Sequence, residues 1–184
     1  MSTSLDLVLE KLVDEQGVIP ALIPPLGEMM VQACAICFDN QGHSSGVEME
    51  VIGDYSITCK VHWQSVVSER MRRSWEDKRA TELAACGIAI LLIYELTQFT
   101  PIEISRIGTG FDYWLGSKDD VETFPFQEYK ARLEVSGIRK GTDSDIERRV
   151  KVKVKQTKTS DHLNLPAYVV VVEFSKPQTK MVIR

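Results

Sequence analysis

Two acidic residues lie in segments that otherwise have the composition of buried β-strands. Asp112 lies in Gly108-Thr-Gly-Phe-Asp-Tyr-Trp114, and Glu134 lies in Ala131-Arg-Leu-Glu-Val-Ser-Gly137. Burying a carboxylate is costly unless a metal, a cation or a set of hydrogen bonds compensates it. If the two strands pair as a hairpin, the carboxylates lie side by side, and their hard oxygen atoms suit Mg²⁺ or Mn²⁺. The alternative is that each acid is an ordinary edge-strand residue paired with Arg106, Arg132 or Lys130.

Glu82 is a third candidate ligand for the same metal. Between Ala80 and Tyr94 it is the only ionisable side chain apart from Cys86, at the start of the apolar half of a predicted helix. A boundary residue that faces solvent is the alternative interpretation. The sequence contains no Ser-His-Asp or Cys-His arrangement and no phosphate-binding glycine loop. Cys34-Ala-Ile-Cys37 lies in an apolar helical pattern, which favours core cysteines over a zinc or redox site.

Composition indicates a folded domain in a reducing compartment. The 184 residues are 43% hydrophobic and 26% charged, which excludes wholesale disorder. The N-terminus has no basic region typical of a signal peptide. The longest apolar run, Leu83 to Tyr94, is too short to cross a bilayer, so no membrane contact is predicted. Four cysteines without disulfide spacing favour the cytoplasm.

Charge is unevenly distributed along the chain. Residues 1–60 carry nine acids against two lysines, a net charge of −7, whereas residues 139–158 carry eight basic residues against three acids, a net charge of +5. The asymmetry suggests an anionic partner for the C-terminal half.

Hydrophobic periodicity and turn residues predict alternating helices and strands. Helices are expected over Leu5–Glu15, Leu26–Asp39, from Ser68 or Asp77 to Gln98, and over 144–158 with Thr142 or Ser144 as N-cap. Strands are expected over the hairpin 47–63 and over Arg106–Leu115, Gln127–Ile138, Ala167–Phe174 (buried on both faces) and Lys180–Arg184 (a short edge strand). This order predicts an α/β or α+β fold with a mixed central sheet flanked by helices.

The predicted order of elements resembles that of the PD-(D/E)XK nuclease superfamily. It consists of a helix with Glu82, a strand with Asp112, a strand with Glu134, a helix and a strand. The resemblance covers about Asp77 to Phe174. It implies a restriction-endonuclease-like core over residues 67–184, with residues 1–66 as an N-terminal extension of helices and a β-hairpin. It also implies hydrolysis of DNA phosphodiester bonds that depends on Mg²⁺ or Mn²⁺, with Glu82, Asp112 and Glu134 as metal ligands.

The chain departs from the family pattern at Ser136, which stands where the family has its catalytic lysine. Some family members place this lysine elsewhere, and Lys155 or Lys158 on the following helix is the expected substitute. Gln156 matches a polar helix position that some branches use. The predicted catalytic set is therefore Asp112, Glu134, Ser136 and Lys155.

Four basic residues of the predicted helix 144–158 share one side by their spacing: Arg148, Lys151, Lys155 and Lys158. We predict that this basic stripe binds phosphates of DNA. A solvated helix face is the alternative. Genome defence is the expected setting of such a nuclease. A second functional hypothesis is a catalytically inactive nuclease-fold protein that acts as a nucleic-acid-binding or scaffold subunit. The sequence leaves open whether a second copy or a partner subunit binds.

Overall fold

The computed structural model describes residues 5–123 and 127–184. Within them the chain forms one mixed sheet of eight strands in the order β1-β3-β2-β8-β7-β6-β5-β4. The strands are β1 (Leu5–Val8), β2 (Val47–Gly53), β3 (Ile57–His62), β4 (Phe99–Ile104), β5 (Tyr113–Ser117), β6 (Ala131–Ile138), β7 (Ala167–Glu173) and β8 (Gln178–Ile183). The predicted mixed sheet flanked by helices is confirmed.

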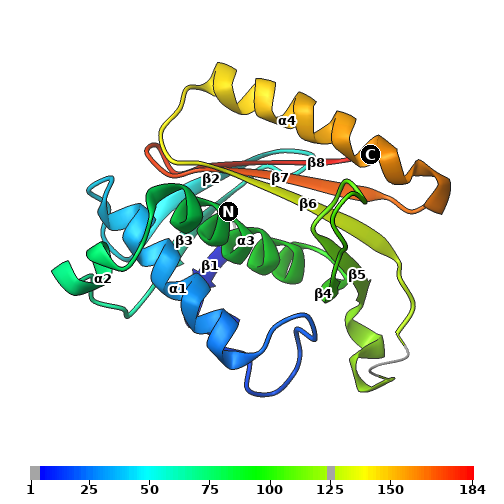
Figure 1. The fold of residues 1–184 in the computed structure, drawn as a ribbon, viewed down its shortest axis with the longest axis horizontal. Coiled ribbons are helices and arrows are strands. Elements are labelled where there is room, and N and C mark those ends of the chain that lie inside the picture. Colours follow the sequence, from blue (N-terminus) through cyan, green and yellow to red (C-terminus); the bar gives the residue numbers. More distant parts are fainter. Residues whose placement is uncertain (1–4, 124–126) are drawn as a thin grey trace.

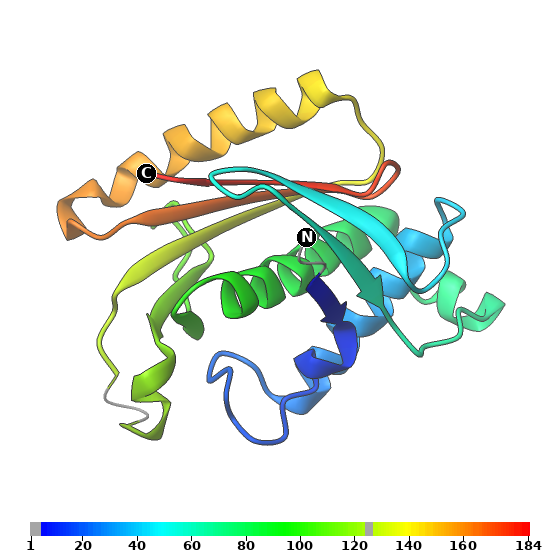
Figure 2. The same ribbon diagram turned by 180° about the vertical axis from the view of Figure 1, so that it is seen from behind.

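Helices cover both faces of the sheet (Figure 1). The described residues form four α-helices: α1 (Pro24–Asp39), α2 (Glu69–Arg73), α3 (Asp77–Leu96) and α4 (Asp143–Thr157). Helices α1 and α3 lie on one face and α4 on the other. The view from behind shows β1 beside the hairpin of β2 and β3, at the end of the sheet far from β4 and β5 (Figure 2).

The two faces of the sheet bury apolar side chains to different extents. Among the described residues, a large core joins α1 and α3 to the sheet, whereas five buried apolar residues form the core under α4: Ile138, Ile146, Val150, Val169 and Val171. Strand β7 is buried along its whole length, as predicted for a strand covered on both faces. The α4 face therefore leaves room for polar contacts between helix and sheet.

The strand pairings place β5 and β6 as predicted. β5 runs antiparallel to β6, with Tyr113 opposite Leu133. β7 runs parallel to β6, and α4 is the crossover between them. Thr142 is the N-cap of α4 and exchanges hydrogen bonds with Asp145, which confirms one of the two predicted caps.

The predicted helix Leu5–Glu15 is wrong. Residues 5–8 form β1, which pairs in parallel with β3, and Leu9–Leu12 form a 3₁₀-helix. The spacing of Leu5, Val8, Leu9 and Leu12 suits a helix, but pairing with β3 determines the conformation of residues 5–8.

Two strand predictions also need correction. The segment 106–112 precedes β5 instead of forming part of it, and β4 was not predicted because Pro101 interrupts its pattern. Proline is tolerated there because β4 is an edge strand. In contrast, β8 was predicted as an edge strand but lies between β2 and β7, paired with both.

Candidate functional site

Three polar residues on the α4 side of β6 each contact α4 or its C-terminal continuation. Arg149 Nη1 donates to Ser136 Oγ at 2.8 Å, and Lys153 Nζ donates to Glu134 Oε1 at 2.5 Å. Arg132 donates to the carbonyl oxygen of Thr157 at 3.0 Å. Alternate residues of β6 thus match every fourth residue of α4, since strand side chains repeat every second residue and helix side chains about every fourth.

Asp112 joins this row from the residue before β5. Its backbone N–H donates to the carbonyl oxygen of Leu133 at 2.8 Å, and its Oδ2 accepts from the backbone N–H of Val135 at 2.7 Å. These two bonds hold the Asp112 carboxylate against β6 at the level of Glu134. The two acids that the sequence analysis paired are therefore neighbours in the structure.

Burial raises the pKa of both carboxyl groups. The Glu134 side chain is 1% exposed, and burial, followed by the charge of Asp112, raises its pKa to about 7 against the opposing effect of Lys153. Burial also raises the pKa of Asp112, and the Val135 N–H and Lys153 oppose the rise. Glu134 Oε2 is buried and has no hydrogen-bond partner. An unpaired carboxylate oxygen next to a second carboxylate is a position that a cation would satisfy.

The structure brings Lys153, not the predicted Lys155, to the acidic pair. Lys153 contacts Glu134, whereas Lys155 is exposed. Ser136 accepts a hydrogen bond from Arg149 and lies two residues beyond Glu134. The sequence did contain the signal for Lys153, because it lies seven residues after Ile146 and three after Val150, both of which face the sheet.

Glu82 lies at the margin of the site. Its side chain is 66% exposed and lies 3.9 Å from Lys78 Nζ, yet its charge contributes to the raised pKa of Asp112. One turn further along α3, burial and the charge of Asp112 raise the pKa of the Cys86 thiol to about 12. In the part of the chain that the structure describes, no three Asp, Glu, His or Cys side chains are grouped closely enough to hold a metal.

Asp112 and Glu134 are the two residues that could hold a magnesium ion. Mg²⁺ keeps several water ligands and is commonly held by one or two carboxylates together with substrate phosphates. The buried, unpaired Glu134 Oε2 beside Asp112 supplies this donor set. Two of the three basic residues of the alternative interpretation pair with other acids, Arg132 with Asp161 and Lys130 with Glu128. The third, Arg106, lines a cavity together with Asp112.

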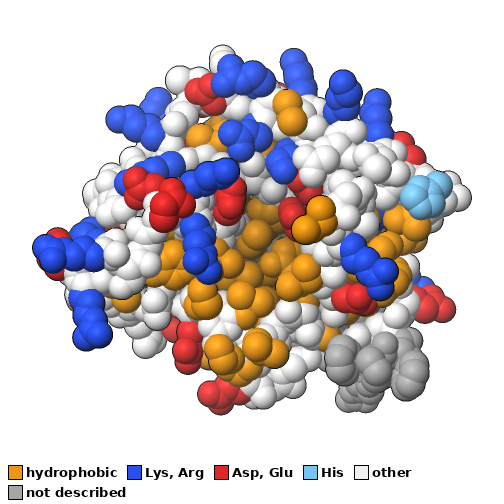
Figure 3. All heavy atoms as spheres, viewed as in Figure 1, with side chains coloured by type: hydrophobic (Ala, Val, Ile, Leu, Met, Phe, Trp, Pro, Cys, Tyr) orange, Lys and Arg blue, Asp and Glu red, His pale blue; other side chains and the backbone are white. Residues whose placement is uncertain are grey.

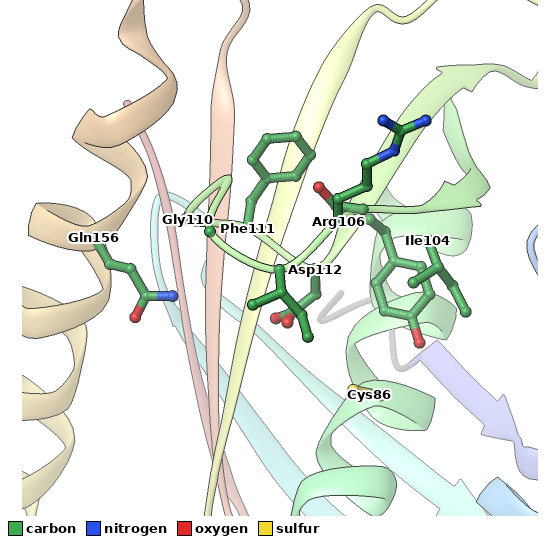
Figure 4. Close-up of a pocket in the computed structure, with 11 residues that line it drawn as sticks. Cys86, Ile104, Arg106, Gly110, Phe111, Asp112 and Gln156 are labelled. Carbon is green, nitrogen blue, oxygen red and sulfur yellow. The ribbon is translucent and has the colours of Figure 1, made fainter.

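A cavity of about 280 Å³ opens beside Asp112 (Figure 4). Gln156 of α4 borders one side, the loop from Ile104 to Phe111 borders the other, and Cys86 of α3 lies below. Gly110 packs against the backbone of Gln156, where a Cβ atom would overlap the carbonyl oxygen, and its φ of +84° is a conformation that favours glycine. The loop and α4 are therefore in direct contact at the edge of this cavity.

The basic stripe of Arg148, Lys151, Lys155 and Lys158 is exposed. By helical spacing it lies on the side of α4 opposite Ile146, Val150 and Lys153. Lysine and arginine side chains follow the edge of the molecule where α4 lies (Figure 3). An apolar area with acidic side chains at its border lies beneath them. The stripe thus points away from the acidic pair.

None of the helices in residues 5–123 and 127–184 combines the length and apolar composition needed to cross a bilayer. Comparison of the chain with protein-family models, with curated proteins and with solved structures found no match.

Proposed function

We propose that this chain is a Mg²⁺- or Mn²⁺-dependent nuclease of the PD-(D/E)XK type that hydrolyses DNA phosphodiester bonds. The observation that carries the proposal is the trio of Asp112, Glu134 and Lys153. Two adjacent carboxylates, one of them almost fully buried, share the site with an ammonium group 2.5 Å from Glu134 Oε1.

The order of elements supports the proposal. Helix α3 precedes three antiparallel strands, β4, β5 and β6, and α4 then leads to β7, parallel to β6. The acids lie next to or within the two strands where the restriction-endonuclease-like layout requires them. Lys153 supplies from α4 the positive charge that Ser136 cannot supply from β6.

Each residue of the trio has a role that follows from its contacts. A bound Mg²⁺ would supply an acidified water and positive charge at the phosphate. Asp112 and Glu134 would hold the ion through the carboxylate oxygens that face one another. Lys153, fixed by Glu134, would orient the attacking water and offset negative charge that develops on the phosphate.

A catalytically inactive relative is the second candidate. It is favoured by Glu82, whose side chain is 66% exposed and lies 3.9 Å from Lys78 Nζ. Among the described residues Glu82 does not join Asp112 and Glu134 in a three-carboxylate site. In this case the Glu134–Lys153 ion pair would be a structural remnant, and the protein would bind nucleic acid without cleaving it.

Cleavage of supercoiled plasmid at pH 8, in excess Mg²⁺ and separately Mn²⁺, tests the proposal. We expect Asp112→Asn, Glu134→Gln and Lys153→Met each to slow cleavage by about 10²-fold or more, because each removes a group from the reacting centre. Lys155→Met, measured alongside, decides which lysine acts. Glu48→Gln is the matched control, since Glu48 is an exposed acid on β2.

Mn²⁺ titration by calorimetry separates the two candidates. The nuclease requires binding that Asp112→Asn weakens, whereas an inactive relative need bind no metal. Cleavage that persists in Asp112→Asn and Glu134→Gln would exclude this site as its origin.

A further inference from the structure

A second row of polar side chains runs along α4 on the side toward β6. Arg149, Lys153 and Gln156 follow one another at spacings of four and three residues and therefore share one side of the helix. Arg149 contacts Ser136, Lys153 contacts Glu134, and Gln156 borders the cavity beside Asp112. This inner row is distinct from the basic stripe on the outer side of α4.

The inner row connects two cavities on either side of the acidic pair. One is the cavity of about 280 Å³ that Asp112 and Gln156 line. The other, of about 550 Å³, lies between α3 and α4 and is lined by Glu82, Ser136, Lys140 and Arg149 among others. One end of the inner row thus lies at the cavity beside Asp112, and the other end lies at the larger cavity.

The larger cavity has an excess of unneutralised positive charge on its α4 side. Its acids are already engaged: Asp77 pairs with Arg139, Glu82 lies by Lys78, and Glu76 caps α3 through the backbone N–H groups of residues 78 and 79. Among the described residues, Arg149 and Lys140 form no ion pair with a carboxylate.

The contact of Arg149 with Ser136 leaves most of its guanidinium free. A guanidinium carries five N–H donors in a planar fork that matches phosphate oxygens. Only one contact, that of Nη1 with the neutral Ser136 hydroxyl, is made within the described residues. The hydroxyl orients the side chain without cancelling its charge, as a phosphate-binding arginine requires.

We propose that Arg149, assisted by Lys140, binds a backbone phosphate of the substrate strand next to the phosphate at the acidic pair. The inference rests on the proposed function, because it takes the acidic pair as the point of cleavage. Along the helix, Arg149 precedes Lys153 by one turn, about 6 Å. In this arrangement Ser136 is a positioning residue for Arg149, which accounts for a hydroxyl at the place of the family's lysine.

Binding of fluorescein-labelled oligonucleotides to the full chain in EDTA tests the inference without cleavage. Duplex DNA, single-stranded DNA and single-stranded RNA of one sequence form the three arms, each measured over a range of salt concentrations. We expect Arg149→Ala to weaken binding about tenfold at low salt in at least one arm. The slope of log K against log salt should become shallower by about 0.9 for a duplex or about 0.7 for a single strand.

Three further variants separate a phosphate contact from a change in structure. Arg149→Lys keeps the charge and should retain most of the salt slope. Ser136→Ala should weaken binding by less than Arg149→Ala, because it removes only the anchor. Arg73→Ala on α2 is the matched control, since Arg73 is exposed and its substitution removes the same charge.

The outcomes distinguish this inference from the proposed function. Equal effects of Arg149→Ala and Arg73→Ala in every arm would overturn the inference, as would the absence of binding by the unsubstituted chain. Cleavage that depends on Asp112 but not on Arg149 would also overturn it and leave the nuclease proposal intact. Binding that depends on Arg149, in a chain that never cleaves, would support the phosphate contact and reject the nuclease.

Discussion

The carboxyl group of Glu134 is held where its charged form is unfavourable. Burial and the neighbouring Asp112 raise its pKa to about 7, and Lys153 alone among the principal influences lowers it. The unfolded chain has an ordinary glutamate pKa of about 4.3. Between these two values the folded protein binds a proton that the unfolded chain has released, so stability decreases as pH rises through this range and the loss is complete above pH 7 or so.

Glu134→Gln should remove this dependence on pH. Relative to the unsubstituted chain, the variant should gain stability on going from pH 5 to pH 8, on the order of 3 kcal/mol, because the amide has no charge to bury. Lys153, 20% exposed, can then extend into water. Urea unfolding at both pH values measures the difference, with Glu48→Gln as control. If the free energies of unfolding of the variant and the unsubstituted chain differ by the same amount at pH 5 and pH 8, Glu134 titrates normally.

At the scale of elements, the loop before β5 determines where Asp112 lies. Gly110 allows the loop to rest on the last turn of α4, and two residues later Asp112 bonds to β6. The loop therefore links α4, which carries Lys153, to the strand that carries Glu134.

Gly110→Ala should destabilise the protein more than Gly108→Ala. Both glycines have positive φ, but a Cβ at Gly108 meets no atom within 4 Å, whereas at Gly110 it overlaps the backbone of Gln156. We expect a loss of about 1 kcal/mol at Gly108 and at least about 2 kcal/mol more at Gly110. Urea unfolding measures both. Equal losses would mean that the loop moves away from α4 at little cost.

The basic stripe gives a second prediction at this scale. Because Lys151 and Lys155 face away from the acidic pair, a nucleic acid bound to them does not place a phosphate there. Lys151→Ala combined with Lys155→Ala should reduce the salt slope of binding by no more than about 1.8, while the cleavage rate at saturating DNA falls less than twofold. A larger fall in the saturated rate would show that the stripe contacts DNA during cleavage.

Several elements could be predicted because local signals suffice for them. The hairpin 47–63, α1, α4 and the buried strand β7 have clear periodicity or caps, and the neighbouring positions of Asp112 and Glu134 followed from pairing two adjacent strands. The position of β8 could not be predicted, because it depends on strands distant in sequence. Lys155 was preferred to Lys153 because only the outer basic residues of α4 were compared with one another, and not with Ile146 and Val150, which face the sheet.

At the scale of the whole molecule, residues 5–66 and the described residues from 67 onward share one sheet. β2 pairs with β8. Helix α1 packs closely on α3 at Gly87, where an added Cβ atom would lie 3.3 Å from the Cβ atom of Met30. The sequence-based division at residue 67 thus separates segments that bury a common core.

A chain that begins at residue 67 should lose cooperative unfolding. It would expose one edge of β8 and the face of α3 that α1 covers, and a small core is difficult to stabilise. We expect a broad urea transition and binding of a hydrophobic dye, whereas residues 1–184 give one sharp transition. A sharp transition at an unchanged midpoint would show that residues 67–184 fold independently.

The place of β8 also affects how the protein is made. Both of its neighbours, β2 and β7, leave the ribosome before it does. Until β8 emerges, each presents an unpaired strand edge to other nascent chains, and such edges favour association between molecules. Translation that slows or stops shortly before Gln178 should therefore yield aggregates, even though most of the hydrophobic core has already been synthesised.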